Sequence, residues 1–352
     1  MIGFSVRKFV GAALGLVALG VAGTAGASSA GAPYADVESA FDRTFTAQQR
    51  SASIAPVRPY TAPVYAPSIY QDPFQARLVQ VANAAQGRIG VAAVDLATGR
   101  SVAVLGDQPF PMASTVKIAV AATYLEMVDN GRFRLSDQFP LMVPVPSRKF
   151  DGAVAPVRRG TLISGQGLME LSLTRSDNAA TDALLAAVGG PGAVNSFLRR
   201  AGISGLRMDR DIATLVRDDG QYNPATTIDV RDSGTPRAMV ELLSGLHQGR
   251  WLSPSSRNLL MDVMSRCVTG KHRIPLLMPT GVNIAHKTGT LSNTASDVGI
   301  ITTPDGRTIA LAIYVTGQGG KPARDARIAE IARTVYDGYL YDSMRNRGTL
   351  AR

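Results

Sequence analysis

The chain has 352 residues, of which 45% are hydrophobic and 18% are charged, a composition typical of a folded globular protein and not of a disordered one. The basic residues behind its net charge of +10 are spread along the chain, and no nucleic-acid-binding motif accompanies them, so no nucleic-acid partner is expected. The single cysteine, Cys267, excludes an internal disulfide, and we predict that it is a buried apolar side chain.

The N-terminus has the form of a secretory signal peptide. Arg7 and Lys8 precede an uncharged, largely apolar run over residues 9–30, in which Ala25-Gly26-Ala27 matches a small-residue cleavage site. We therefore predict a signal peptide over residues 1–27 and an exported, periplasmic protein. The alternative is that the same run stays uncleaved and anchors the protein in the membrane.

Residues 28–72 differ in character from the rest of the chain. Their prolines are scattered among Ala, Ser, Gln and Tyr without a helical or strand period. This composition predicts an extended, mobile linker. Its tyrosines Tyr60, Tyr65 and Tyr70 allow docking on another surface, although a solvated spacer is the simpler interpretation.

The hydrophobic pattern after the linker predicts strands near both ends of the chain and mainly helices between them. We therefore expect one antiparallel sheet completed by both ends and a largely helical subdomain, which is an α+β fold. The predicted helices include residues 74–86, 118–128 and 324–336, and the predicted strands are 89–95, 101–105, 286–288, 298–302 and 308–315.

The tetrapeptide Ser114-Thr115-Val116-Lys117 lies where a turn gives way to the apolar helix at 118–128. Residues three apart in a helical turn lie on one face, with about 5–6 Å between their Cβ atoms, so an amine can reach a hydroxyl. A serine needs such a base because its hydroxyl is a weak nucleophile at neutral pH. A helix N-terminus also offers free N–H groups to an oxyanion. Alone, the pattern is weak, because serine and lysine meet by chance at many helix starts.

Two further tripeptides follow in chain order. Ser176-Asp177-Asn178 opens an alanine-rich helical stretch, and Lys287-Thr288-Gly289 lies inside a β-like run. Each has an ordinary structural interpretation, as a helix cap or as the end of a strand. The set S-x-x-K, S-D-N and K-T-G is the signature of class A β-lactamases and penicillin-binding proteins, and chance explains all three together poorly.

On these motifs the chain resembles the class A serine β-lactamase family. The similarity extends to Phe110-Pro111-Met112-Ala113, to LAAVGGPG at 185–192 and to RDSGTPR at 231–237. It covers about Pro73 to Asp342, which leaves residues 343–352 as a C-terminal tail. The resemblance implies an α/β sandwich and an all-α lobe, with the active site in the cleft between them. We expect no cofactor, no metal and a monomer.

The resemblance and the chemistry of the residues together assign the catalytic roles. Ser114 is the nucleophile that becomes acylated, and Lys117 is its candidate base. Lys117 can accept a proton only when neutral, and burial and the charge of Lys287 would both lower its pKa. Ser176 relays a proton to the leaving nitrogen and is expected to be held by Lys287.

The remaining motif residues are predicted to bind the substrate. Asn178 orients Lys117 and a substrate acylamide group, and Lys287 with Thr288 binds the substrate carboxylate. By match to the family pattern, the backbone N–H groups of Ser114 and Thr290 form the oxyanion hole, where one donor is typically worth about 3 kcal/mol in the transition state.

One departure from the family affects the second half of the reaction. Class A β-lactamases use a glutamate after S-D-N to activate the water that frees the acyl-enzyme. The register through Met208-Asp209-Arg210 places Ile212 at that position, and no glutamate occurs between Glu170 and Glu241. The neighbouring Asp211 has a shorter side chain, which we expect to point elsewhere.

The loop around this position is also longer than is usual in the family, because Asp218-Asp219-Gly220 is inserted in it. Arg210 and Asp232 are nevertheless predicted to form the ion pair that closes the loop.

Other chemistries find less support. The three histidines, His247, His272 and His286, lack the spacing of a zinc site. His286 alternates away from Lys287 along the strand, and we predict a residue at the rim of the site rather than a base.

Three functions remain open on the sequence alone. The leading interpretation is an exported serine hydrolase that is acylated at Ser114 by β-lactams and hydrolyses the β-lactam amide, with slow deacylation. The second is a D,D-peptidase that acts on peptidoglycan stem peptides, and the third is a β-lactam-binding sensor without turnover. Motifs of this kind determine fold and acylation better than they determine substrate.

Overall fold

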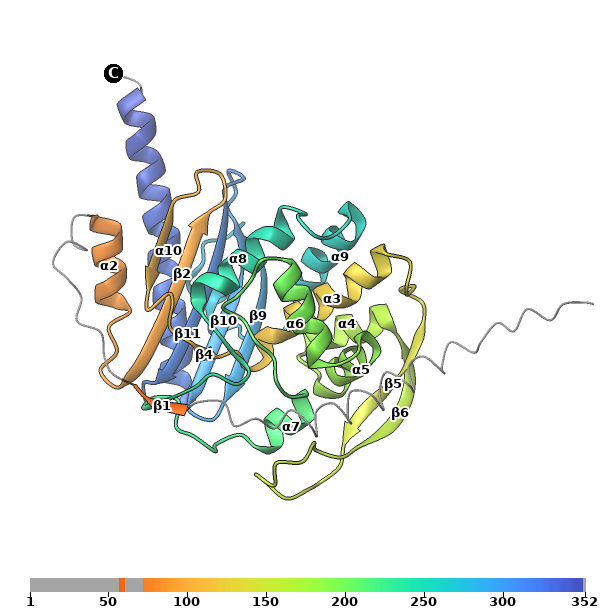
Figure 1. Ribbon diagram of the computed structural model, residues 1–352. Coiled ribbons are helices and arrows are strands. Elements are labelled where there is room, and N and C mark those ends of the chain that lie inside the picture. The colour runs from red at the N-terminus through yellow and green to blue at the C-terminus, as the bar shows by residue number, and fades with distance from the viewer. Residues whose placement is uncertain (1–56, 61–71, 351–352) are drawn as a thin grey trace, which may run out of the picture. The chain divides into compact units, whose positions relative to one another are not determined.

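The computed structural model describes residues 57–60 and 72–350 (Figure 1). The predicted signal peptide at 1–27 and most of the predicted linker lie outside the described residues. Within the two described ranges, no helix combines the length and the hydropathy that crossing a membrane requires.

The main sheet has five antiparallel strands in the order β3-β2-β11-β10-β9. They are β2 (Gly87–Asp95), β3 (Ser101–Val104), β9 (Asn283–Leu291), β10 (Thr294–Thr302) and β11 (Thr308–Gly317). Strands from the two ends of the domain pair directly, since Tyr314 of β11 lies opposite Gly90 of β2. The expected antiparallel sheet completed by both ends is therefore confirmed, and β9, which carries K-T-G, lies at its edge.

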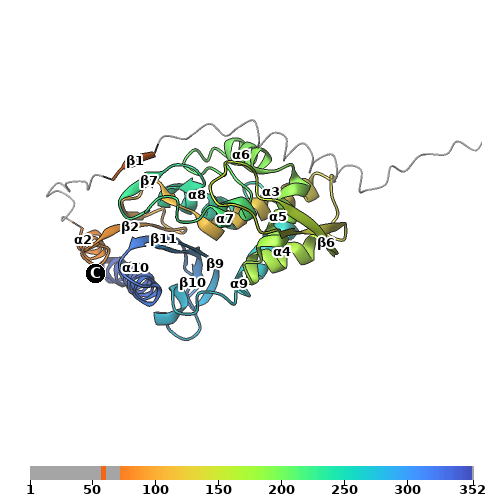
Figure 2. The same cartoon turned by 90° about the horizontal axis from the view of Figure 1, so that it is seen from below.

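The central strand β11 contributes to two hydrophobic cores, because successive side chains of a strand point to opposite faces. Leu311 and Ile313 belong to the core that the sheet forms with α2 (Pro73–Val81) and α10 (Lys321–Leu350). Ala312 and Tyr314 belong to the core that includes α8 (Pro236–His247). Figure 2 shows the sheet between α10 and α2 on one side and α8 on the other.

The helices α2 and α10 pack against each other on the outer face of the sheet. The ring of Phe74 meets that of Tyr339 edge-on at 5.0 Å, and the Tyr339 hydroxyl donates a hydrogen bond to the carbonyl of Ala93 at 2.9 Å. Compared with the predictions, α2 stops at Val81 rather than at Gln86, and α10 extends beyond 324–336 in both directions.

The helical subdomain is built around α3 (Lys117–Asp129), which is buried along most of its length. A helix that is apolar on every side has no solvent face and must lie inside a core. Around it lie α4 (Gly165–Thr174), α5 (Asn178–Val188), α6 (Pro191–Arg200) and α9 (Pro254–Ser265), with the hairpin of β5 (Gln138–Pro144) and β6 (Val157–Ser164).

Short elements connect the two parts. They are β4 (Phe110–Pro111) paired with β8 (Ser233–Gly234), the turns η2 (Ala113–Val116) and η3 (Ile274–Leu277), and the helix α7 (Ile212–Arg217). In addition, β1 (Val57–Pro59) pairs with β7 (Thr227–Asp229). The strand β1 lies within the segment predicted to be a linker and was not predicted, because three residues are too few to show a strand period.

Candidate active site

Ser114 lies in the 3-10 turn η2, directly before α3 begins at Lys117. The turn is held by Thr115, whose backbone N–H and hydroxyl both donate to the carbonyl of Met112, at 3.0 and 2.7 Å. Ala113 has a positive φ of 49°, a conformation that costs a non-glycine residue energy and often occurs at functional sites. The predicted placement of Ser114 and Lys117 one turn apart is confirmed, although the serine precedes the α-helix.

The side chain of Lys117 is completely buried and makes its contacts with the S-D-N motif. Its ammonium donates to Asn178 Oδ1 at 2.7 Å, to the Ser176 carbonyl at 2.8 Å and to Ser176 Oγ at 3.3 Å. Burial, followed by repulsion from Lys287, lowers the pKa of Lys117 to about 7. The prediction that both effects act on this lysine is confirmed.

The S-D-N motif presents these oxygens through its backbone conformation. Ser176 has a left-handed φ of 58°, and Asp177 is the N-cap of α5, accepting from the N–H of Ala180 at 2.7 Å. The chain therefore turns sharply at Ser176 before α5 begins at Asn178. This local fold directs Ser176 and Asn178 toward the same ammonium.

On the opposite side, Lys287 is fully buried on β9, and burial is the main cause that lowers its pKa to about 8. Its ammonium donates to the carbonyl of Thr288 at 2.9 Å. No hydrogen bond joins Lys287 to the Ser176 side chain among the described residues, and the prediction that Lys287 holds the Ser176 hydroxyl stays a prediction. This bond to its own strand uses one of the three N–H donors of the ammonium.

Gly289 brings β9 against the turn that carries Ser114. A Cβ atom at this position would lie 2.7 Å from the carbonyl oxygen of Met112 and 3.1 Å from the Cβ of Ala113. The first distance is shorter than real Cβ contacts, so only a residue without a side chain allows this approach. The glycine of K-T-G therefore determines how closely β9 approaches the turn η2, which carries Ser114.

Arg273 supports the end of the same strand, and no sequence motif indicated it. Its buried guanidinium forms an ion pair with Asp325 at 2.7 Å and donates to the carbonyl of Gly289 at 2.8 Å. It also donates to the hydroxyl of Thr290 at 2.7 Å, the residue predicted to provide an oxyanion donor. A single arginine in the loop before η3 has no characteristic spacing, so only the fold identifies it.

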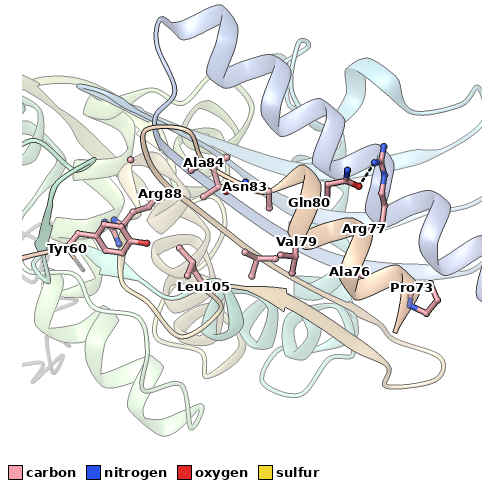
Figure 3. Close-up of a pocket in the computed structure, with 14 residues that line it drawn as sticks. Tyr60, Pro73, Ala76, Arg77, Val79, Gln80, Asn83, Ala84, Arg88 and Leu105 are labelled. Atoms are coloured by element: carbon pink, nitrogen blue, oxygen red, sulfur yellow. Dashed lines mark hydrogen bonds between the residues drawn. The ribbon is translucent and has the colours of Figure 1, made fainter. Parts of the chain in front are cut away.

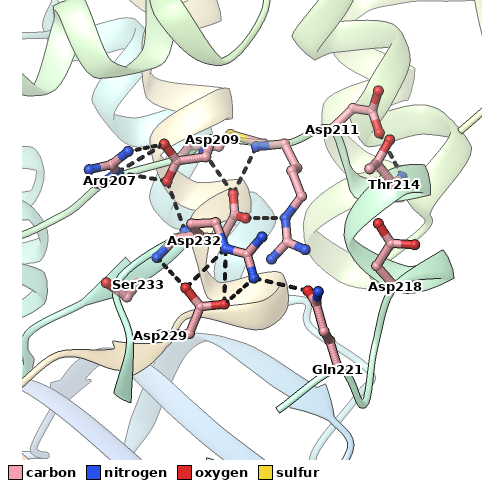
Figure 4. Close-up of polar contacts among 12 residues, drawn as sticks. Arg207, Asp209, Asp211, Thr214, Asp218, Gln221, Asp229, Asp232 and Ser233 are labelled. Carbon is pink, nitrogen blue, oxygen red and sulfur yellow. Dashed lines mark hydrogen bonds and ion pairs between the residues drawn. The ribbon is translucent and has the colours of Figure 1, made fainter. Parts of the chain in front are cut away.

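The position of the expected glutamate is apolar and packed. Ile212 is the first residue of α7 and is buried in the main core. The carboxylate of Asp211 accepts from the N–H of Thr214 at 2.6 Å and caps α7 (Figure 4). This contact confirms that the side chain of Asp211 is used elsewhere.

A second buried carboxylate lies next to this position and was missed by the sequence analysis. The two oxygens of Asp182, on α5, accept from the N–H groups of Ile212 and Ala213, at 2.7 and 2.8 Å. Burial and the nearby charge of Asp211 raise the pKa of Asp182 well above its usual range. Asp182 follows Asn178 by one helical turn, but an aspartate in an alanine-rich helix gave no reason to connect it with a loop thirty residues away.

The loop that contains α7 is closed by a buried ion pair. Asp232 accepts from Arg210 Nε at 2.6 Å and from the N–H groups of Asp209 and Arg210 at 2.7 and 3.0 Å (Figure 4). The predicted pairing of Arg210 with Asp232 is confirmed.

The inserted residues attach this loop to two neighbouring segments. Asp218 accepts from the N–H of Phe150, in the β5–β6 connection, at 3.0 Å. Asp219 accepts from the N–H of Ser292, in the turn between β9 and β10, at 2.8 Å. The insertion therefore links the helical subdomain to the end of the strand that carries K-T-G.

Two predictions on the far side of β9 are wrong. His286 is not at the rim but buried, with its Nδ1 2.8 Å from Asp297 Oδ1. It is buried because the loop after α9 covers this side of β9, an arrangement that strand alternation alone does not reveal. Cys267, predicted to be a buried apolar side chain, is partly exposed and lies 3.2 Å from the hydroxyl of Thr269.

A surface pocket of about 760 Å³ contains none of the motif residues (Figure 3). It is lined by α2, the start of β2, Leu105 and Tyr60. Its buried Arg88 donates to the carbonyl of Pro109 at 2.9 Å and lies 4.4 Å from the centre of the Phe110 ring. Arg88 thus supports the segment leading to Ser114. In the described part of the chain, no three His, Cys, Asp or Glu side chains are arranged to hold a metal ion.

Comparisons with known proteins agree with this geometry. A family model described as the beta-lactamase enzyme family (Beta-lactamase2) matches residues 73–339. The chain therefore belongs to the class A serine β-lactamase family.

Individual relatives show how far the similarity extends. The carbapenem-hydrolyzing beta-lactamase KPC of Klebsiella oxytoca is 32% identical over 72% of this chain and 84% of its own length. The structure of an ancestral class A beta-lactamase (GNCA) is 35% identical, with a TM-score of 0.64 over 75% of this chain and 99% of that chain. The structure of a PBP-A mutant in which a leucine is replaced by glutamate, an acyl-enzyme complex with penicillin G, is 26% identical, with a TM-score of 0.65 over 77% and 97% of the two chains.

The approach of β9 to η2 leads to a testable prediction. Replacing Gly289 by Ala should push the strand away from the Ser114 turn, and a displacement near 1 Å typically costs about a hundredfold in rate. We expect covalent labelling by a fluorescent penicillin to slow by about that factor, measured by gel fluorescence over time. Gly192→Ala is the matched control, because a Cβ there would meet nothing within 4 Å. Labelling of Gly289→Ala at the wild-type rate would contradict the prediction.

Proposed function

We propose that the protein is an exported active-site-serine hydrolase that is acylated at Ser114 by β-lactams and hydrolyses the β-lactam amide, with slow deacylation. The observation that carries the proposal is the buried Lys117 ammonium, held by Ser176 and Asn178 and with its pKa lowered to about 7. Such a lysine is neutral in a large fraction of molecules near neutral pH and can act as a base. Export rests on the signal-like segment at residues 1–27.

In the acylation step, neutral Lys117 takes the proton of the Ser114 hydroxyl as the serine oxygen attacks the β-lactam carbonyl. The developing oxyanion accepts hydrogen bonds from the backbone N–H groups of Ser114 and Thr290. The Ser176 hydroxyl, which contacts the Lys117 ammonium at 3.3 Å, passes a proton to the departing nitrogen. The C–N bond then breaks and the acyl group stays on Ser114.

Substrate binding is assigned to the β9 side of the site and to Asn178. The positive charge of Lys287 and the hydroxyl of Thr288 suit a carboxylate, a group common to β-lactams and to the end of a peptide. Asn178 keeps its amide NH₂ for a substrate carbonyl, because its Oδ1 already accepts from Lys117.

The deacylation step lacks its usual base. Ile212 cannot activate water, Asp211 caps α7, and both oxygens of Asp182 accept backbone N–H groups. The acyl-enzyme is therefore expected to hydrolyse slowly.

The same feature favours a second candidate function, a D,D-peptidase acting on peptidoglycan stem peptides. The similar PBP-A mutant carries an introduced glutamate and is described as an acyl-enzyme complex with penicillin G. An enzyme of this type transfers an acyl group without the glutamate that β-lactamases use. A sensor that is acylated without turnover is the third possibility, and the experiments below distinguish all three.

The first prediction concerns the nucleophile. Ser114→Ala should abolish covalent labelling by a fluorescent penicillin and leave the melting temperature nearly unchanged, because only a hydroxyl is removed. Ser147→Ala provides a control serine outside the three motifs. Undiminished labelling of Ser114→Ala would refute the assignment.

A second prediction follows from the two lysines. The acylation rate should rise with pH around a midpoint near 7, because only neutral Lys117 accepts a proton and its pKa is about 7. Lys287→Ala removes a positive neighbour, so the midpoint should move up toward the ~10.4 of a free lysine. Stopped-flow acylation at several pH values measures both, with the exposed Lys271, changed to Ala, as control. A flat profile between about pH 5 and 9 would exclude a lysine base.

A third prediction concerns deacylation. After mixing with benzylpenicillin, mass spectrometry should show an adduct that lasts minutes or longer. Steady nitrocefin hydrolysis supports the β-lactamase, release of D-alanine from a stem peptide supports the D,D-peptidase, and a stable adduct with neither supports the sensor. Fast hydrolysis without any adduct would mean that another group activates water.

The same reasoning suggests substitutions that would speed the hydrolysis of the acyl-enzyme. A glutamate at position 212 would join the buried carboxyls of Asp182 and Asp211, whose pKa values burial already raises, and the same burial next to two acidic groups would favour its neutral form. Ile212→Glu combined with Asp182→Asn should therefore shorten the adduct lifetime more than Ile212→Glu alone. The amide oxygen of asparagine can still accept one of the two backbone N–H groups.

A further inference from the structure

The strand β1 lies before the part of the chain that the family model matches, yet it pairs with a strand inside that part. The match begins at residue 73, whereas β1 pairs antiparallel with β7, in the connection that follows α7. Directly after β1, the N–H of Tyr60 donates to the carbonyl of Thr226 at 2.9 Å. The chain therefore adds a short strand to the loop that lies beside the candidate active site.

The ring of Tyr60 covers a buried cation (Figure 3). The guanidinium carbon of Arg88 lies 5.3 Å from the centre of the Tyr60 ring and 4.4 Å from the centre of the Phe110 ring, and Arg88 is only 1% exposed. Burial lowers the pKa of Arg88 to about 10, so the side chain remains charged at neutral pH. A cation is attracted to the faces of aromatic rings, most strongly where water is excluded. The two rings therefore hold the guanidinium between them.

Arg88 joins two segments of the site through their backbone carbonyls. Its Nη1 donates to the carbonyl of Pro109 at 2.9 Å, and its Nε and Nη2 donate to the carbonyl of Pro224 at 3.4 and 3.3 Å. Pro109 precedes β4, which leads to Ser114, and Pro224 lies between the inserted residues 218–220 and β7. An arginine presents its donors in a rigid planar fork, which suits it to contact two groups at once.

The turn before Ser114 needs such support because its backbone is strained. Ala113 has a φ of 49°, a conformation that persists only where the surrounding contacts fix it. The N–H of Met112 donates to the carbonyl of Asp232 at 3.0 Å, and the segment before it is held by Arg88. A relaxation at Ala113 would rotate the next peptide group, and with it the N–H and the hydroxyl of Ser114.

We propose that Tyr60 and Arg88 are positioning residues for acylation: Tyr60, placed by β1, holds the Arg88 guanidinium against Pro109 and Pro224, and this contact keeps the Ser114 turn in its reactive conformation. Neither residue is among those assigned to contact the substrate. The proposal rests on the proposed function, because it concerns acylation at Ser114. An oxyanion-hole donor acts mainly in the transition state, so the loss of Tyr60 should slow the chemical step rather than weaken substrate binding.

Stopped-flow acylation by a fluorescent penicillin over a range of concentrations separates the saturating rate from the half-saturating concentration. We expect Tyr60→Ala to lower the saturating rate about tenfold, which is less than the roughly hundredfold loss caused by a displacement of about 1 Å. The half-saturating concentration should stay nearly unchanged. Tyr60→Phe keeps the ring and should retain the wild-type rate, and Tyr341→Ala removes an exposed tyrosine of α10 as the control. A wild-type saturating rate in Tyr60→Ala, or a loss of the same size in Tyr60→Phe, would overturn the proposal.

A double-mutant cycle tests whether Tyr60 acts through Arg88. If it does, Tyr60→Ala combined with Arg88→Met should be no slower than Arg88→Met alone, because both changes remove the same support. Losses that multiply would overturn this route. If Arg88→Met does not fold, Arg88→Lys takes its place in the cycle, because it keeps the charge but loses the planar fork.

Amide hydrogen exchange of the full chain tests the same support without reference to the reaction. In Tyr60→Ala, peptides that cover residues 105–116 and 221–233 should exchange faster than in the wild type, whereas peptides from α6 should not change. Unchanged exchange in both segments would overturn the proposal. If the wild-type protein is not acylated at all, the proposed function fails instead, and the exchange result still decides whether Tyr60 supports the two segments.

Discussion

The structure of the site depends on one buried ammonium group. Among the described residues, Lys117 has no carboxylate hydrogen-bond partner and is held by oxygens of Ser176, Asp177 and Asn178. An isolated charge of this kind is costly inside a protein, and the cost is reduced because the pKa of Lys117 falls to about 7. The contacts that keep the lysine in place therefore hold a group whose pKa lies near neutral pH. The left-handed turn at Ser176 and the cap at Asp177 together direct these oxygens toward it.

The strand β9, which carries K-T-G, is positioned beside Ser114 by close packing rather than by charge alone. β9 is an edge strand, and its Gly289 allows it to approach the turn of Met112 and Ala113. Arg273 then anchors the strand end through the carbonyl of Gly289 and the hydroxyl of Thr290. Lys287 is brought near enough to lower the pKa of Lys117 without a direct hydrogen bond to Ser176. The repulsion between Lys287 and Lys117 thus depends on how closely Gly289 lets β9 pack against η2.

The loop at α7 shows a different use of carboxylates from that of the β-lactamases with a catalytic glutamate. Asp182 and Asp211 are both close to Ile212, yet both are occupied with backbone N–H groups at the start of α7. They stabilise the start of α7 through these hydrogen bonds. The inserted Asp218 and Asp219 fasten the same loop to both neighbouring segments. These contacts favour a rigid loop beside the site.

The sequence predicted the sheet and the helical subdomain, the three motifs, the pairing of Arg210 with Asp232 and an apolar residue at position 212. These features depend on local periodicity, on caps or on short spacings, which are visible in one dimension. The folded structure was needed to show that His286 is buried against Asp297 and that Cys267 lies beside the hydroxyl of Thr269. It was also needed to show that Asp182 and Arg273 support the site. Each of these side chains meets a partner from another element. The alternation of side chains along β9 does not reveal that the loop after α9 covers His286. Contacts between distant segments depend on how close their backbones come, and here glycines such as Gly270 and Gly289 determine that distance.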